Sequence, residues 1–387
     1  MTTTDAVAAQ LSLLDRFLPL WILLSAALGL GLGQLSAVHR FIDATTVGSM
    51  NVLVGIGLLF MMYPPLANVR WNAVHVALRD WRLLLLTTVQ NWIVGPLAMC
   101  LLSTAFFHDQ PGFMAGFSLV GCARCIGMVM IWIVLAGGDA EYAAAIIAVN
   151  SVITMALYAP YASVLLHWLP KALHVDVVDH VHITMLEIAV NVLIYMGIPF
   201  ACAIAGWLVL TRIKGDAWYY DSFAARLDVV ALLALLFTIV VLFASQSQRI
   251  TSTIGPVLYA TVPYTIYGVI VFTSSFAMSV QCGATCAQCV TLAFTATSNN
   301  YELSLGVAVA TFGLDSDEAM MSVVAALIEI PIMLVLVHAS LWCERRWFPD
   351  QRAARLRMKD EGYHHTQDEV DASARQQCAL EQARRGG

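Results

Sequence analysis

Two polar clusters, each inside a long apolar stretch, hold the residues best suited to chemistry. The first is residues 121–125, with Arg124 beside Cys125, and the second is residues 295–302, which ends in Glu302. A charge at membrane depth costs at least ~2.5–3.5 kcal/mol on insertion scales, so such residues usually face a cavity or a partner. Arg124 and Glu302 therefore predict a site for a small polar solute or a proton. The alternative is a structural Arg124–Glu302 ion pair that locks two helices together.

The other members of these clusters extend the predicted site. The thiol sulfur of Cys125 is a candidate ligand for a soft metal or metalloid, although a buried cysteine is commonly a packing residue. Ser298, Asn299 and Asn300 supply hydroxyl and amide groups. They either bind the hydroxyls of a solute or satisfy backbone groups freed by a break in the helix.

Further residues leave two interpretations open. Glu329 lies two residues before Pro331 and is a second candidate for proton exchange, or makes a helix–helix hydrogen bond. Cys282, Cys286 and Cys289 follow helical spacing, so one helix face could present three thiols to a metalloid or pack them in a seam. Residues 174–182, HVDVVDHVH, either bind a metal or form a solvated loop.

The composition requires lipid as the solvent of the chain. Of its 387 residues 59% are hydrophobic and 12% are charged, whereas soluble domains carry about a quarter charged residues. The net charge of −6 argues against a nucleic-acid partner. No phosphate-binding loop or catalytic motif is present, so the sequence predicts neither an ATP-driven pump nor an enzyme, and no cofactor.

A membrane-spanning helix needs about 20 mostly apolar residues. Ten stretches qualify, so we expect an all-α polytopic membrane protein. They are residues 17–35, 46–66, 83–107, 111–136, 141–168, 182–211, 227–247, 255–279, 284–312 and 318–343.

The distribution of Lys and Arg predicts the orientation of these spans. Ten spans put both termini on one side, and that side collects most of the basic loop residues, whereas the other side has Arg40, Lys171 and Arg249. Both termini are therefore expected in the cytoplasm of a cell-membrane protein. The predicted parts are a cytoplasmic N-terminus (1–16), a first five-helix repeat (17–168), an external loop (169–181), a second five-helix repeat (182–347) and a polar cytoplasmic tail (348–387).

The two polar clusters occupy corresponding places in the two halves. Aligning residues 117–125 with 294–302 places Cys125 on Glu302, and each cluster lies in the fourth span of its half. Paired interrupted spans in an inverted repeat indicate the binding site of a transporter. We therefore expect an inverted five-plus-five repeat in which helices 4 and 9 are discontinuous.

Several longer motifs carry a resemblance to a known family. They include FMMYPPLANVRW (60–71), QNWIVGPLAM (90–99), ARCIGMVMIW (123–132), NVLIYMGIPF (191–200), LLFTIVVLF (235–243), LAFTATSNNYELSLGVAVATFG (292–313) and EIP (329–331). The sequence resembles the arsenite efflux permeases of the ACR-three type, in the bile acid/arsenite/riboflavin transporter superfamily. The motifs follow one another in order from about residue 17 to 347.

The resemblance implies export of trivalent arsenic, as arsenous acid, and sometimes of antimonite, in exchange for protons. It places the essential cysteine of span 4 on Cys125 and the essential acid of span 9 on Glu302. It also implies that the discontinuous helices 4 and 9 cross each other. The expected partners are the solute, protons and the lipid bilayer, and no obligate protein partner is predicted. The alternative on the same fold is a sodium-coupled organic-anion symporter, since Asn299, Asn300 and Glu302 offer the oxygen ligands that a cation needs.

Overall fold

A computed structural model describes residues 18–47, 50–71, 80–168, 185–247 and 254–349. The predicted N-terminal segment 1–16, the external loop 169–181, the 174–182 stretch and residues 350–387 of the tail lie outside these ranges. The chain divides into two compact units, Met1–Val337 and His338–Gly387. Every residue of the candidate site belongs to the first unit.

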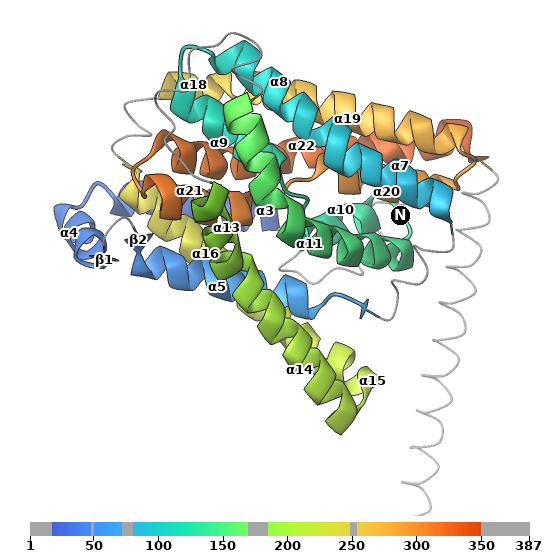
Figure 1. Cartoon of the computed structure of the whole chain (residues 1–387), viewed down its shortest axis with the longest axis horizontal. Helices are drawn as coiled ribbons and strands as arrows, with labels where there is room; N and C mark the ends of the chain where they lie inside the picture. The colour runs from blue at the N-terminus through green and yellow to red at the C-terminus, as the bar shows by residue number, and fades with distance from the viewer. Residues whose placement is uncertain (1–17, 48–49, 72–79, 169–184, 248–253, 350–387) are drawn as a thin grey trace, which may run out of the picture. The chain divides into compact units, whose positions relative to one another are not determined.

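The described residues are almost entirely helical, which confirms the predicted all-α class (Figure 1). The only strands among them are the two-residue pair β1 (Thr46–Val47) and β2 (Met50–Asn51). The first half contains α3 (Leu18–Leu32), α4 (Ser36–Ala44), α5 (Val52–Ala67), α7 (Trp81–Val89), η2 (Gln90–Val94), α8 (Gly95–Phe107), α9 (Pro111–Gly121), α10 (Met128–Leu135), α11 (Ala140–Ser163) and η3 (Val164–Trp168). The second half contains α13 (Met185–Val192), η4 (Leu193–Gly197), α14 (Ile198–Lys214), α15 (Asp216–Trp218), η5 (Tyr219–Ala224), α16 (Ala225–Ser245), α18 (Ile254–Tyr259), α19 (Thr261–Gln281), α20 (Cys286–Thr297), α21 (Tyr301–Phe312) and α22 (Asp317–Trp347).

Each of the ten predicted segments contains at least one helix, but fewer of them are continuous spans. Within the described ranges, 6 helical stretches are long and apolar enough to cross a membrane, or 7 if the bent pair 20–32 and 36–42 forms one span. The α5, α9, α20 and α21 helices are apolar but shorter. The predicted spans 111–136 and 284–312 are each divided between two helices. The count of ten spans therefore stays a prediction.

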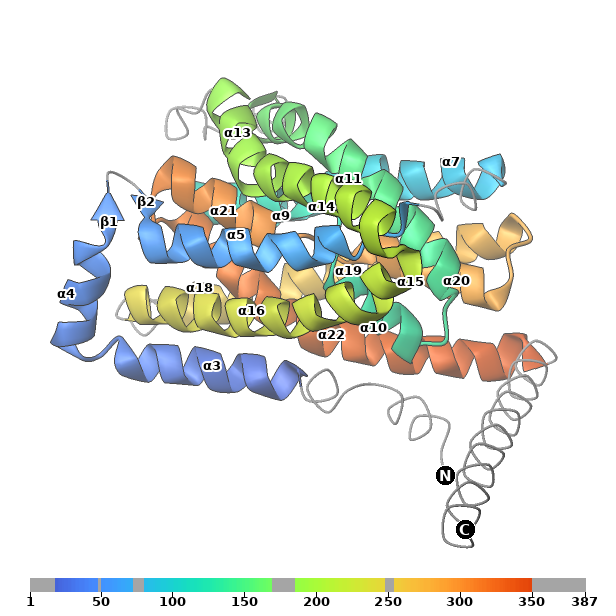
Figure 2. The ribbon, with the colours of Figure 1, turned by 90° about the horizontal axis from the view of Figure 1, so that it is seen from below.

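Two sets of helices pack within the first unit. Figure 2 shows α3, α5 and α16 running side by side, and α14 also packs against α5. We call α3, α5, α14, α15, η5 and α16 the first helix group. The α8 helix packs against α9 and α19, α19 packs against α20, and α11 contacts α10 and α20. We call α8–α11, α19 and α20 the second helix group.

Small residues let the backbones of the first group approach closely. A Cβ atom added to Gly29 of α3 would lie 2.6 Å from the carbonyl oxygen of Val240 in α16, and one added to Gly57 of α5 would collide with the Thr238 hydroxyl of α16. In lipid, helices associate through such close packing, because the surrounding acyl chains are as apolar as the helix surfaces.

Candidate functional site at two interrupted helices

The two predicted interruptions are present, and they pair with each other. The α9 helix ends at Gly121 and α10 begins at Met128, while α20 ends at Thr297 and α21 begins at Tyr301. The intervening segments form an antiparallel bridge between Arg124 and Asn299. Unwound backbone deep in a membrane protein is tolerated where protein satisfies its polar groups, and this pairing does so.

Two backbone hydrogen bonds define the bridge. The amide of Cys125 donates to the carbonyl oxygen of Ser298 over 3.2 Å, and the amide of Asn300 donates to the carbonyl oxygen of Ala123 over 3.0 Å. The bridge therefore fixes Cys125 beside the Ser298–Asn300 segment, although 173 residues separate Cys125 from Ser298 in the chain (298 − 125).

Arg124 is fully buried, and its guanidinium binds helix ends. It donates to the carbonyl oxygen of Ala296 over 2.6 Å, near the end of α20, and to that of Gly121, at the end of α9. The last carbonyls of a helix have no partner within the helix and carry the negative end of its dipole. Arg124 therefore stabilises the C-terminal ends of both interrupted helices.

The alternative prediction of a structural ion pair between Arg124 and Glu302 is wrong. The structure shows no ion pair between the described residues Arg124 and Glu302. The physical reason is that carbonyl oxygens and the hydroxyl of Tyr267, which accepts from Arg124 over 2.9 Å, already surround the guanidinium.

A chain of buried hydrogen bonds leads from Arg124 to Glu329. The Tyr267 hydroxyl lies 3.0 Å from Oδ1 of Asn299, to which it donates, and Nδ2 of Asn299 donates to the Tyr264 hydroxyl over 3.2 Å. Tyr264 in turn donates to Oε2 of Glu329 over 2.9 Å. The chain joins the interrupted segment of span 9 to α19 and α22.

Glu329 receives two more hydrogen bonds from the bridge segment. The Ser298 hydroxyl donates to its Oε1 over 2.6 Å, and the Asn299 amide donates to the same oxygen over 3.4 Å. Glu329 thus makes the helix–helix hydrogen bonds that were one of its two interpretations. Sequence reasoning missed Tyr264 and Tyr267; their signal was two hydroxyls three residues apart, on one face of an apolar helix.

Asn300 and Glu302 shape the start of α21. The Asn300 side chain accepts a hydrogen bond from the Leu303 amide over 2.9 Å, which is an N-cap. Asn300 therefore serves the freed backbone, one of the two roles considered for it. Glu302 lies in the first turn of α21, where the helix dipole favours a negative charge.

A cavity of about 970 Å³ reaches Glu302. The start of α10 also lines it, through Ile126, Gly127 and Met128, so both half-helices that follow the interruptions begin at this cavity. Cys125 directly precedes this lining and is 3% exposed.

The remaining predicted site residues lie behind this surface. Arg124, Ser298 and Asn299 are completely buried, and Asn300 is 1% exposed. Of the predicted site residues, Glu302 lines the cavity in this conformation, and the others do not.

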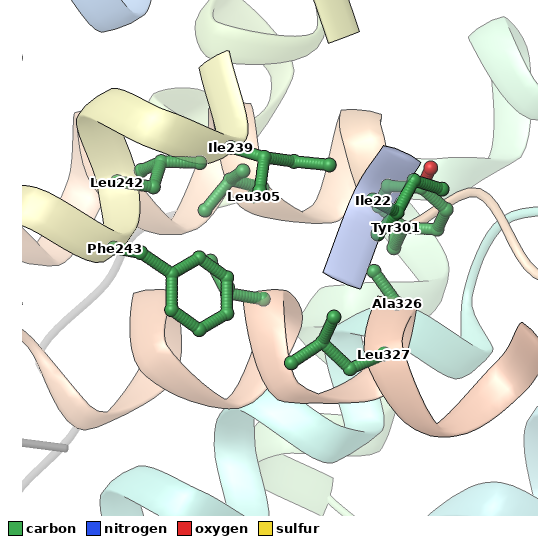
Figure 3. Close-up of a pocket in the computed structure, with 9 residues that line it drawn as sticks. Ile22, Ile239, Leu242, Phe243, Tyr301, Leu305, Ala326 and Leu327 are labelled. Atoms are coloured by element: carbon green, nitrogen blue, oxygen red, sulfur yellow. The ribbon is translucent and has the colours of Figure 1, made fainter. Parts of the chain in front are cut away.

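A second pocket, of about 20 Å³, has a different character (Figure 3). Its walls are apolar side chains of α3, α16, α21 and α22, with the ring of Tyr301 at one end. Because it offers a polar solute almost no hydrogen-bond partner, it is a packing gap and no candidate binding site.

The three clustered cysteines do not share one helix face. The α20 helix begins at Cys286, and Cys282 lies in the preceding turn, at the end of α19. The prediction of one three-thiol face is therefore wrong, because a helix boundary interrupts the spacing. In the part of the chain that the structure describes, no group of three His, Cys, Asp or Glu side chains is arranged to hold a metal ion.

Comparison with known proteins is consistent with this architecture. Residues 55–253 match the Sodium Bile acid symporter family. The chain is 37% identical over 350 residues to the arsenical-resistance protein Acr3 of Corynebacterium glutamicum, which covers 90% of this chain and 94% of that protein. It is 26% identical to Acr3 of Alkaliphilus metalliredigens (87% and 94% covered) and 29% identical to an uncharacterized transporter of Synechocystis (88% and 91% covered).

The family match covers half of the chain, and the alignment with the Corynebacterium protein covers almost all of it. The motifs that carry the resemblance include those that form the paired interruptions. The chain therefore belongs to the Sodium Bile acid symporter family of membrane transporters, in the group of the Acr3 arsenical-resistance proteins.

Proposed function

We propose that this protein exports trivalent arsenic, as arsenous acid, in exchange for protons, and so confers arsenic resistance. The observation that carries the proposal is the pairing of the two interrupted helices, which holds Cys125 next to Ile126 in the lining of a cavity that Glu302 also lines. The names of the two Acr3 relatives support the choice of solute. Antimonite, with the same valence and soft centre, is a second expected solute.

The chemistry of arsenous acid fits these residues. The molecule is uncharged at neutral pH and has three hydroxyls on a soft arsenic atom. Cys125 forms an As–S bond while one As–O bond breaks, and the thiol proton leaves with the hydroxyl as water. Ser298, Asn299, Asn300 and Arg124 are the proposed donors and acceptors for the remaining hydroxyls. Because they are buried here, their contact with the solute belongs to a second conformation.

Glu302 is the proposed proton-coupling acid, and Glu329 is the second candidate. Glu302 lines the cavity, and in the proposed mechanism a proton and a solute compete for the space beside its carboxyl. Loss of its proton on the cytoplasmic side allows arsenous acid to bind, and reprotonation from outside expels it. Alternation of the cavity between the two sides of the membrane couples the fluxes, as in other transporters with inverted repeats.

The proposed setting is the cell membrane, with ten spans in two inverted repeats and both termini in the cytoplasm. The match between the ten predicted segments and the helices supports this arrangement, as does the pairing of two interruptions in corresponding places. The cavity opens beside Arg70 and Glu141, which the predicted topology assigns to the cytoplasm. The conformation described here is then the one open to the cytoplasm.

A sodium-coupled symporter is the second candidate, favoured by the family to which residues 55–253 match. Flux of arsenite into everted membrane vesicles tests both functions. A vesicle interior made acidic should drive arsenite uptake, and a sodium gradient without a pH gradient should not. Uptake that follows sodium alone would contradict proton exchange, and no arsenite flux under either gradient would contradict the choice of solute.

A further inference from the structure

Three charged residues besides Glu302 line the cavity, and because they are exposed we call their surroundings its mouth. They are Arg70, which follows the end of α5, Glu141 in the first turn of α11, and Asp216 at the start of α15. All three are exposed. A neutral solute such as arsenous acid has no need of formal charges along its path, so these residues call for another explanation.

The first helix group contributes a cation and an anion to the mouth, and the second group contributes an anion. Arg70 belongs to the wall made by the first group, and its guanidinium lies 5.6 Å from the ring centroid of Tyr220 in η5. Asp216 is on the same wall. Glu141 lines the cavity from α11 of the second group. Among the described residues neither Arg70 nor Glu141 is in an ion pair.

We propose that Arg70 and Glu141 form the gate of the cavity: when the two helix groups approach, these side chains pair and close its cytoplasmic mouth. The inference rests on the proposed transport function, because alternating access requires the mouth to close in each cycle. Arg70 is suited to this role, since a planar guanidinium can bind a carboxylate through two parallel hydrogen bonds.

The open and closed mouths differ in the strength of this pair. Two exposed charges in water attract weakly and are screened by salt. Closure removes water from between the walls, which lowers the local dielectric and strengthens the attraction, while the cost of desolvation opposes it. Because these effects largely balance, the pair favours the closed mouth without locking it, as a cycling transporter needs.

Charge exchange tests the pairing through arsenite flux in everted vesicles. Arg70→Glu and Glu141→Arg should each reduce flux at least fivefold, because like charges then face each other, and the double exchange should recover most of it. Arg70→Glu with Asp216→Arg is the matched control and should not recover flux, since Asp216 shares the wall of Arg70. Wild-type flux in both single variants, or no recovery in the double exchange, would overturn the proposal.

A labelling experiment tests the gate without measuring transport. Met130 lines the cavity inside the mouth, so Met130→Cys reports closure when Cys202, Cys282, Cys343 and Cys378 are replaced by Ser. An impermeant maleimide added to everted vesicles should label this cysteine several-fold faster when Arg70→Gln or Glu141→Gln removes the pair. Equal labelling rates in the variants with and without the Arg70–Glu141 pair would contradict the proposed gate. If wild-type vesicles moved no arsenite but labelling changed as stated, the solute assignment would fail and the gate would stand.

Discussion

At the scale of single residues, the site shows how a cation is held inside an apolar protein. Arg124 is fully buried, yet it is stabilised by carbonyl oxygens and a tyrosine hydroxyl. Its neighbour Cys125 completes the bridge through its backbone amide, which donates to the carbonyl oxygen of Ser298. In the proposed mechanism the thiol binds the solute, whereas in this conformation the guanidinium stabilises the fold.

Cys125→Ser should abolish arsenite export while membrane insertion remains normal, because serine keeps the shape but removes the soft sulfur ligand. The matched control is Cys122→Ser, in the same interruption, where the buried thiol donates to the carbonyl oxygen of Ser118 over 3.2 Å. A serine hydroxyl can make that bond, so Cys122→Ser should retain export. Arsenite accumulation in cells measures both, and full resistance in Cys125→Ser would remove this residue from the site.

Replacing Glu302 and Glu329 should separate the effect on proton coupling from the effect on thermal stability. Glu302→Gln should abolish export driven by a pH gradient with little loss of thermal stability in detergent, because Glu302 faces the cavity. Glu329→Gln should lower the unfolding temperature, since glutamine offers one acceptor where the donors Ser298, Tyr264 and the Asn299 amide now bind two oxygens. Leaving a buried donor unpaired costs about 1–3 kcal/mol.

The comparison has a clear contrary outcome. If Glu302→Gln still responds to the pH gradient as the wild type does, Glu302 is not the coupling acid, and Glu329 takes its place in the proposal. Equal unfolding temperatures for the two variants would contradict the hydrogen bonds assigned to Glu329.

At the scale of helices, the paired interruptions depend on a close approach by α8. A Cβ atom added to Gly95, at the start of α8, would lie 2.9 Å from Nη1 of Arg124. The guanidinium has little freedom to move away, because the same nitrogen donates to Ala296 and Tyr267. Gly95 is thus a positioning residue for the bridge between the two interruptions.

Gly95→Ala should therefore lower both stability and arsenite export. Overpacking of a well-packed interior costs typically about 1–3 kcal/mol, and displacement of Arg124 disturbs the bridge that holds Cys125. Gly31→Ala in α3 is the control, because a Cβ atom there meets nothing within 4 Å. Unfolding temperature in detergent and vesicle flux measure the effect, and a Gly95→Ala variant as stable and active as Gly31→Ala would refute it.

At the scale of the whole molecule, the proposed orientation makes a simple topological prediction. A single cysteine introduced at position 174 should react with an impermeant reagent added to intact cells, and one at position 70 should react only in everted vesicles. The reason is the excess of Lys and Arg on the side that holds both termini. The reverse pattern would invert the proposed membrane orientation and place the described cavity on the external side.

The sequence by itself determined where the helices are interrupted and which chemical groups lie there. Polar residues inside an apolar segment carry a cost that local sequence reveals, so the interruptions at 121–127 and 298–300 were predictable, and with them Arg124, Cys125 and Glu302. The family motifs follow the same stretches.

Only the tertiary structure decided which groups satisfy one another. Arg124 binds the ends of α9 and α20 instead of Glu302, and Tyr264 and Tyr267 join it to Glu329. A sequence shows that a buried charge needs partners, but two of the partners of Arg124, Tyr267 and Ala296, come from segments more than a hundred residues away. Their identity depends on which helix ends meet in space, because hydrogen bonds form only over about 3 Å.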